Sequence, residues 1–153
     1  MSAIDTSFRI AELLVSGLRC SHVLMLLALE ARGESDPALV KSMSGLALGL
    51  GQGFNCGCLT AGCAVLGLYA GRADVDDEDD PRLAALIDDF SGWFHAMAKE
   101  RFGGIDCADI MRFDEALQAQ RCPALIAAVW DRLETTLADH GFDPAGAEPA
   151  EGA

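Results

Sequence analysis

The segment from Gly45 to Gly71 constrains the fold more than any other part of this chain. It holds eight glycines and three of the six cysteines, and it has no charged residue. Glycine lets backbone segments approach each other closely, and cysteine supplies a thiol that can ionise, bind metal or form a disulfide. The segment therefore predicts a closely packed site that presents sulfur.

The composition favours helices over strands. The chain has 153 residues, of which 51% are hydrophobic and only 7% are aromatic, and Ala, Leu and Gly dominate over the β-branched residues. Because Ala and Leu favour helices whereas β-branched and aromatic residues favour strands, we predict an all-α fold. A chain of this length forms one core without cross-links. We expect a compact single-domain bundle of about six helices over residues 1–141, with a glycine-rich central helix pair, and a disordered acidic tail over residues 142–153.

The formal net charge of −13 limits the kinds of partner. Nucleic acids and anionic membrane surfaces attract clustered Lys and Arg, so we expect neither as a partner. The uncharged segment is long enough to cross a bilayer, but Gln52, Asn55 and the glycines beside them would interrupt a helix there, so we expect no membrane span. The N-terminus has charged residues where a signal peptide has an apolar run, which predicts a cytoplasmic protein. Cysteines in a reducing compartment are more often catalytic, redox-active or metal-bound than disulfide-bonded.

Start and stop signals divide the chain into predicted helices. Polar caps, proline at first helical positions and terminal glycines set the expected boundaries, and apolar periodicity sets the faces. We predict helices from Thr6 to about Gly17, from Cys20 to Gly33, from Pro37 to about Leu50, from Cys56 to about Tyr69, along the stripe Leu83–Met97, a short one from Cys107, and a last one from Cys122-Pro123 to Leu137.

Four cysteines fall at or beside a predicted helix N-terminus. The helix dipole and the free N–H groups of the first turn favour negative charge there, so a thiolate is stabilised. Four such thiolates can bind a metal ion or an iron–sulfur cluster, or can exchange between dithiol and disulfide. The competing interpretation is that they are buried cysteines, which pack as small apolar side chains. The four residues are Cys20, Cys56, Cys107 and Cys122.

Cys58, Cys63 and His22 are secondary candidates for metal binding. Cys58 and Cys63 lie inside the predicted fourth helix, where filling the core is the simpler role for Cys63. His22 lies two residues after Cys20, but a single histidine on an apolar helix is more often a core residue. The chain has no C-x-x-C and no ferredoxin spacing, so the spacing does not name a cofactor. It also has no nucleophile elbow, P-loop or dinucleotide motif, so we assign no catalytic residue.

The chain resembles the C-GCAxxG-C-C family, which consists of small helical bacterial proteins named for redox activity. The resemblance covers about residues 8–137. It rests on an ordered set of segments: Cys20 at the start of a helix, NCGCLTAGCAVLGLYAG at residues 55–71, FGGIDCADI around Cys107 and RCPALI around Cys122.

Two cysteines compete for the place of the motif cysteine. The string GCAVLG at residues 62–67 matches the family name literally and contains Cys63. Alignment of the residues that follow favours Cys56-Gly57 instead, with Ala61 in the place of the expected second glycine. Both assignments stay open at this point.

The resemblance implies redox activity or an iron–sulfur site in a bacterial cytoplasm, and it names no substrate. We therefore predict an electron-transfer protein in which Cys20, Cys56, Cys107 and Cys122 bind an iron–sulfur cluster, with [2Fe–2S] as the favoured form, and which exchanges electrons with a redox partner protein. One alternative is a metal-free thiol–disulfide protein in which pairs such as Cys107 and Cys122 cycle. Another is a helical accessory subunit whose acidic surface docks a partner enzyme.

Overall fold

The structure, a computed structural model, describes residues 1–147. Within these residues it has seven α-helices and no β-strand, which confirms the all-α fold class; the number of helices is seven rather than about six. The helices are α1 (Ala3–Val15), α2 (Cys20–Ala31), α3 (Pro37–Ser42), α4 (Gly57–Ala70), α5 (Leu83–Phe102), α6 (Cys107–Met111) and α7 (Glu115–Asp139), with two short turns, η1 (Met43–Leu46) and η2 (Gly49–Gly53), between α3 and α4.

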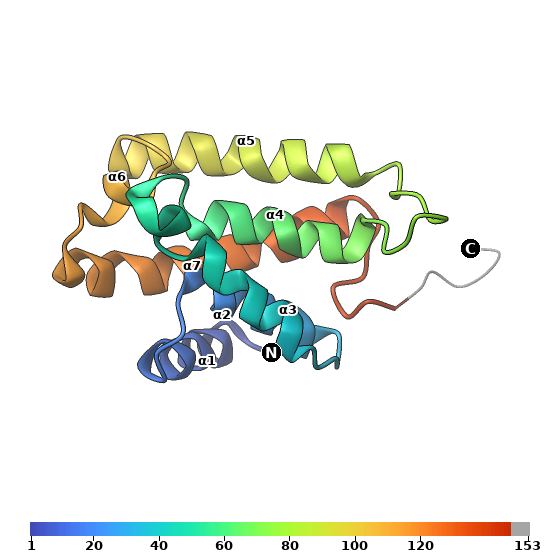
Figure 1. The fold of residues 1–153 in the computed structure, drawn as a ribbon, viewed down its shortest axis with the longest axis horizontal. Coiled ribbons are helices and arrows are strands. Elements are labelled where there is room, and N and C mark those ends of the chain that lie inside the picture. Colours follow the sequence, from blue (N-terminus) through green and yellow to red (C-terminus); the bar gives the residue numbers. More distant parts are fainter. Residues whose placement is uncertain (148–153) are drawn as a thin grey trace.

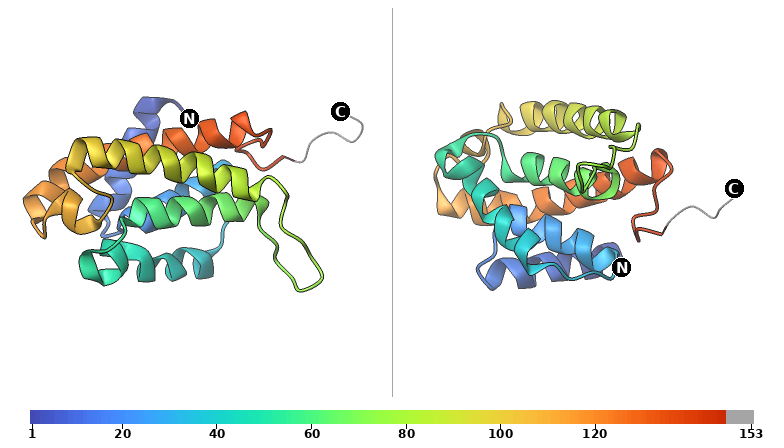
Figure 2. Two further views of the ribbon diagram at one scale, coloured as in Figure 1. Left: turned by 90° about the horizontal axis from the view of Figure 1, so that it is seen from above. Right: turned by 45° about the vertical axis from the view of Figure 1, so that its right-hand side comes forward.

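The long helices α4, α5 and α7 pack against one another, and α1, α2 and α3 lie along one side of them (Figure 1). Figure 2 shows the same arrangement from two further directions. Helix α2 packs against both α4 and α7 and is buried on most faces, as its apolar sequence predicts. The predicted apolar stripe of α5 is also in the core, where Leu86, Phe90 and Phe94 are fully buried.

Side-chain caps determine where several helices begin. The Asp36 carboxylate accepts the N–H of Leu39 at 3.0 Å, and the Asp114 carboxylate accepts the N–H of Ala116 at 2.8 Å. The first N–H groups of a helix have no partner within the helix, so each cap stabilises its helix by about 1 kcal/mol. At the C-terminal end of α5, Gly103 adopts φ 84° and ends the helix, as the sequence predicted for this glycine.

The predicted third helix is wrong beyond Ser42. The chain turns through η1, Ala47 is extended at φ −63° and ψ 147°, and residues 48–51 all adopt positive φ. Two of these four residues are leucines, Leu48 and Leu50, for which the left-handed conformation costs about 1–2 kcal/mol each. A hydrogen bond from the N–H of Phe54 to the carbonyl of Gly49, at 3.0 Å, closes this left-handed turn.

The structure does not show the predicted glycine-rich central helix pair. Gly49 and Gly53 lie in η2, where both have positive φ. A Cβ atom on Gly49 would collide with the backbone of Phe54, and one on Gly53 would lie 2.6 Å from Cζ of Phe113. These glycines therefore serve the turn and its contact with the segment after α6. Helix α4 packs mainly against α2 and α5 instead.

The predicted start of the last helix at Cys122 is also wrong. Helix α7 begins at Glu115, and Cys122 and Pro123 lie inside it. Residues 115–120 contain several strong helix formers, and Asp114 caps the first turn, so the helix begins before the proline. Because proline lacks an N–H, the carbonyl four residues earlier loses its backbone hydrogen bond. The helix tolerates the loss of this one bond.

The residues after α7 turn back onto the bundle. The guanidinium of Arg82 lies 3.8 Å from the centre of the Phe142 ring, and the Tyr69 hydroxyl donates to the carbonyl of Pro144 at 2.5 Å. The predicted disordered tail covers residues 142–153, of which 148–153 lie outside the described residues. Its first residues contact the loop before α5 and the C-terminal part of α4.

Candidate functional site: a pocket lined by five cysteines

Cys20 is the first residue of α2, as predicted. His22 holds this helix start in place: its Nδ1 accepts the N–H of Arg19 at 3.1 Å, and its Nε2 lies 2.7 Å from the Ser44 hydroxyl. The ring therefore connects α2 to η1. His22 is not among the residues that line the pocket to which Cys20 contributes.

Gly57 allows the start of α4 to lie directly against Cys20. A Cβ atom on this glycine would lie 2.7 Å from the Cys20 sulfur and 3.2 Å from the carbonyl oxygen of Leu46. Any side chain here would push the sulfur or the backbone away. The Cys56-Gly57 pair thus places one thiol at the start of α4 and leaves space for a second thiol from α2.

A single β-bridge joins the segments that precede α4 and α6. The N–H of Cys56 donates to the carbonyl of Ile105 at 3.0 Å, and the N–H of Cys107 donates to the carbonyl of Phe54 at 2.7 Å. Cys107 then begins α6, where Asp109 forms the predicted capping box. The bridge places Cys56 and Cys107 at adjoining helix starts, although they are far apart in the sequence.

One pocket of about 510 Å³ collects thiols from four helices. Cys20 comes from α2, Cys56 and Cys58 from the start of α4, Cys107 from α6 and Cys122 from α7. We call this the cysteine pocket. The structure thus brings the four primary candidates to one place and adds Cys58.

The rest of the cysteine pocket is mainly apolar. Leu14, Val15 and Leu18 line it from the α1–α2 corner, and Ile110 and Met111 line it from α6. The few polar lining groups are Arg19, Glu115 and Gln118.

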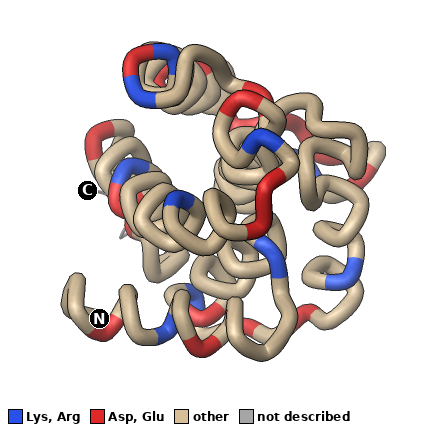
Figure 3. Tube along the Cα trace, turned by 90° about the vertical axis from the view of Figure 1, so that its left-hand side faces the viewer, with Lys and Arg blue, Asp and Glu red and all other residues tan. Residues whose placement is uncertain are grey.

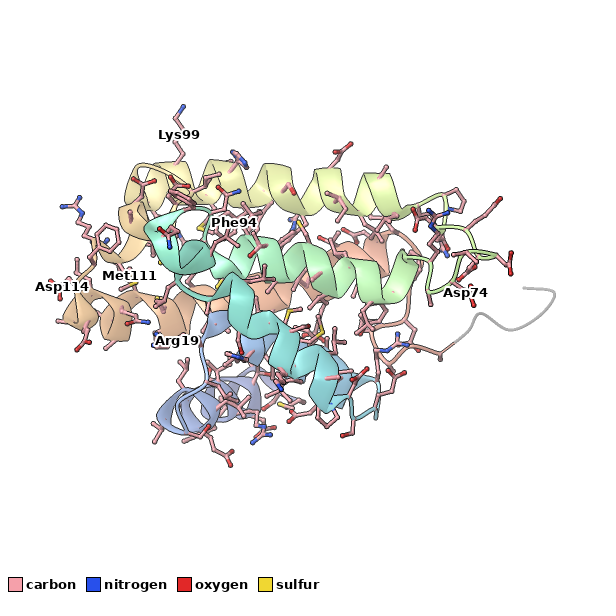
Figure 4. The ribbon with its side chains drawn as sticks, in the orientation of Figure 1. Arg19, Asp74, Phe94, Lys99, Met111 and Asp114 are labelled. Carbon is pink, nitrogen blue, oxygen red and sulfur yellow. The ribbon has the colours of Figure 1, made fainter. Side chains whose placement is uncertain are left out.

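The acidic loop between α4 and α5 lies at the opposite end of the molecule from the cysteine pocket. Figure 4 shows Asp74 of this loop far from Met111 and Asp114. Figure 3 views the molecule from the end that carries α6, where basic and acidic residues are interspersed. The negative charge of the chain is therefore not concentrated around the thiols.

Cys56 and Cys58 form an asymmetric pair. A hydrogen bond from the Cys58 thiol lowers the pKa of Cys56; burial opposes this effect, and the N–H groups of Cys58 and Leu59 at the helix start add to it. Hydrogen bonding to Cys20 and Cys56, together with burial, raises the pKa of Cys58 well above its usual value. The arrangement favours a thiolate on Cys56 and a neutral thiol on Cys58.

Cys107 and Cys122 are held as neutral thiols. Burial, and after it the charges of neighbouring thiolates, raise the pKa of Cys107 to about 11 and that of Cys122 to about 12. The prediction that a helix start would stabilise these two thiolates is therefore wrong. Cys122 lies inside α7, and α6 has only five residues, so desolvation outweighs the helix dipole at both positions.

Cys63 lies outside the cysteine pocket, on the part of α4 that faces α5. Its sulfur is 3.7 Å from the Ser91 hydroxyl, and burial raises its pKa. It does not line the pocket with the other five cysteines. Cys63 therefore serves as an internal control for experiments on the pocket.

The donor set of the cysteine pocket suits soft metals. Thiolates bind iron–sulfur clusters, Zn²⁺ and Cu⁺. All six cysteines are free thiols. Among residues 1–147, no group of three or more His, Cys, Asp or Glu side chains is arranged to hold a metal ion.

A family model described as "Putative redox-active protein (C_GCAxxG_C_C)" matches residues 18–136, a region that includes every cysteine. The chain belongs to this family. Membership in the C_GCAxxG_C_C family supports redox activity and identifies no cofactor. No curated protein and no solved structure matches the chain significantly.

The structure separates the two candidates for the motif cysteine of the C_GCAxxG_C_C family. Cys56 shares a pocket with Cys20, Cys107 and Cys122, whereas Cys63 does not. This favours Cys56-Gly57. No helix in the described part of the chain is both long and apolar enough to cross a bilayer.

Reasoning from the sequence underestimated Cys58 and did not consider Arg19. The signal for Cys58 was its position two residues after Cys56. Both residues then lie at the start of the same helix, and both line the cysteine pocket. Arg19 immediately precedes Cys20, and its positive charge lowers the pKa of Cys107, although burial outweighs it.

Proposed function

We propose that this protein is an electron-transfer protein whose cysteine pocket binds an iron–sulfur cluster. The observation that carries the proposal is the convergence of five thiols from four helices, because disulfide chemistry requires only two. Cys20, Cys56, Cys107 and Cys122 would supply the four thiolates of such a cluster, and [2Fe–2S] is the form we favour. The bound cluster would supply one-electron redox chemistry.

The chain's own residues support this assignment in two ways. Gly57 leaves space beside the Cys20 sulfur that any side chain would fill. The charges of neighbouring thiolates contribute to the raised pKa values of Cys107 and Cys122. Bound iron would relieve this repulsion, because the positive charge of a metal ion stabilises the deprotonated form of its thiol ligands.

Cys58 has a different role in this proposal. It is fully buried, and its interactions with Cys20 and Cys56, together with burial, raise its pKa, so it stays a neutral thiol that can donate a hydrogen bond to one of these two sulfurs. Hydrogen bonds to ligand sulfurs tune the reduction potential of an iron–sulfur cluster. We therefore assign Cys58 to the tuning of a ligand sulfur and not to the ligand set.

The cellular setting follows from the chemistry. Free thiols persist in a reducing compartment, so we propose a cytoplasmic protein. A redox partner protein would deliver or accept the electrons.

The test is metal and sulfide analysis of protein purified without oxygen. We expect iron, acid-labile sulfide and visible absorption in the wild type, and a large loss of all three in Cys122→Ser. The matched control is Cys63→Ser, which should retain them because Cys63 lies outside the pocket. If Cys63→Ser lost iron and Cys122→Ser did not, the assignment of the ligands would be wrong.

A second candidate function, thiol–disulfide exchange without metal, is favoured by one observation. The lowered pKa of Cys56 makes this residue a suitable attacking thiolate, and Cys58, which lines the same pocket, is available as the resolving thiol. A colourless protein with six titratable thiols and no iron would support this candidate over the iron–sulfur site.

A further inference from the structure

Helix α1 has an apolar stripe that no other part of the described chain covers. Ile4, Phe8, Ala11 and Val15 are spaced by four, three and four residues, so at 100° per residue they fall within an arc of about 60°. The side chains of Ile4, Phe8 and Val15 are 70, 73 and 89% exposed. The opposite part of the helix surface packs against α2 and α7.

The stripe is continuous and accessible. The charged residues Asp5, Arg9 and Glu12 all lie along one edge of the stripe, so none of them interrupts the apolar positions. Arg9 and Glu12 pair with each other at 3.2 Å. Figures 1 and 2 show α1 at the periphery of the molecule. Alternating spacings of three and four residues are typical of a helix that packs along another helix.

We propose that α1 packs antiparallel against α1 of a second copy of this chain, in a two-fold symmetric dimer. The spacings of four, three and four residues are the same in both directions along the helix. Antiparallel packing therefore sets Phe8 opposite the small Ala11 of the second copy and Ile4 opposite its Val15. A parallel pair would set phenylalanine against phenylalanine and alanine against alanine, with crowding at one level and a void at the next. Two-fold symmetry repeats each favourable contact twice.

The area available is sufficient for a weak dimer. Complete burial of Met1, Ile4, Phe8 and Val15 on both copies would remove at most on the order of 1,200 Å² from water, which reaches the lower end of the range for stable interfaces. Two copies that each carry a charge of −13 repel each other, and Asp5 comes near Glu12 of the second copy. Added salt should therefore strengthen the dimer.

The dimer would also complete the cysteine pocket. Ala11 and Val15 belong to the stripe and line the pocket as well. In the antiparallel arrangement Ile4 of the second copy packs on Val15 and covers that side of the opening. The second copy would thereby exclude water from the thiols, which lowers the local dielectric around any redox group.

The first test is sedimentation equilibrium of the metal-free protein over a concentration range of about 1 µM to 1 mM, which brackets a weak dimer. We expect the mass to rise from 16.1 kDa to twice that value and the association to strengthen with salt. Phe8→Ser should weaken association by about 100-fold or more, because each dimer loses two buried aromatic side chains. Val75→Ser is the matched control, since Val75 is 88% exposed on the distant acidic loop. A wild type that is monomeric throughout, or a Phe8→Ser variant that still dimerises as the wild type does, overturns the proposal.

The second test addresses orientation. Ile4→Glu and Val15→Lys should each abolish the dimer, and the double variant should restore it, because antiparallel packing brings the two new, opposite charges together across the interface. The two positions are too far apart on one helix to pair with each other. Circular dichroism confirms that each variant is folded. Failure of the double variant to recover overturns the antiparallel arrangement. Neither test requires iron, so their outcomes are independent of the proposed function.

Discussion

Replacement of Gly57 by alanine tests the central contact of the cysteine pocket. The new Cβ atom would lie 2.7 Å from the Cys20 sulfur and 3.2 Å from the Leu46 carbonyl oxygen. Ordinary contacts of this kind are about 3.5–4.0 Å, so the sulfur must move by about 1 Å. The Cys20 side chain can rotate, but the Leu46 carbonyl is backbone and moves only with η1.

The expected effect on stability is moderate, whereas the effect on the site is large. Overpacking costs about 1–3 kcal/mol, and replacing glycine by alanine in a helix regains about 1 kcal/mol. The net loss of about 0–2 kcal/mol lowers the melting temperature by up to about 8 °C for a domain of this size. Displacement of a ligand or its support typically weakens metal binding by about 10–100-fold.

Gly67→Ala is the matched control for this experiment. Gly67 lies in the same helix, and a Cβ atom there would meet no atom within 4 Å. This variant should gain about 0.5–1 kcal/mol from reduced backbone entropy of the unfolded chain. The measurements are thermal unfolding, iron content, and the rate at which iodoacetamide labels Cys20, followed by mass spectrometry. Our reasoning is refuted if Gly57→Ala raises the melting temperature as Gly67→Ala does and leaves Cys20 labelling and iron content unchanged.

Three further predictions concern packing, backbone strain and pH. Gly62→Ala should lose about 1–3 kcal/mol in urea unfolding, because its Cβ atom would collide with the Phe90 ring, and should retain its iron; a stabilised variant would contradict this. Arg112→Gly should gain about 0.5–1 kcal/mol in the same assay, because Arg112 ends α6 at φ 52°, and a destabilised variant would show that its side chain matters more. In the metal-free protein the pKa values of Cys107 and Cys122, about 11 and about 12, exceed the value of 9.0 for an ordinary thiol. The unfolded chain therefore loses these protons first, and stability should fall as the pH rises from 9 toward 12, with a smaller fall in Cys122→Ala.

Local signals in the sequence predicted most helix starts correctly. Cys20 and Cys107 begin α2 and α6, and Asp36 caps α3, because capping depends on side chains within three residues of the helix end. The start of α7 shows the limit of such signals. Asp114 and Cys122-Pro123 are both acceptable starts, and the sequence pattern does not reveal that the earlier one captures two N–H groups with its side chain.

The conformation of the segment after α3 could not be predicted from local sequence preferences. Leu48 and Leu50 adopt positive φ, which leucine disfavours, so no propensity predicts the left-handed turn. The Phe54 N–H closes the turn, and the packing of Phe113 over Gly53 holds its end against α6. Contacts between segments that are remote in the sequence therefore override the local preference for a longer third helix.

The sequence by itself determined an all-α fold, the positions of Cys20, Cys56 and Cys107 at helix starts and the glycine that accompanies Cys56, because these depend on neighbouring residues. Only the tertiary structure decided that Cys58 joins the pocket and Cys63 does not, and that Cys107 and Cys122 stay protonated. The physical reason is that a thiol's pKa and its partners depend on which distant segments cover it. Helix packing, the β-bridge beside Cys56 and desolvation of the pocket therefore decided the chemistry of the site.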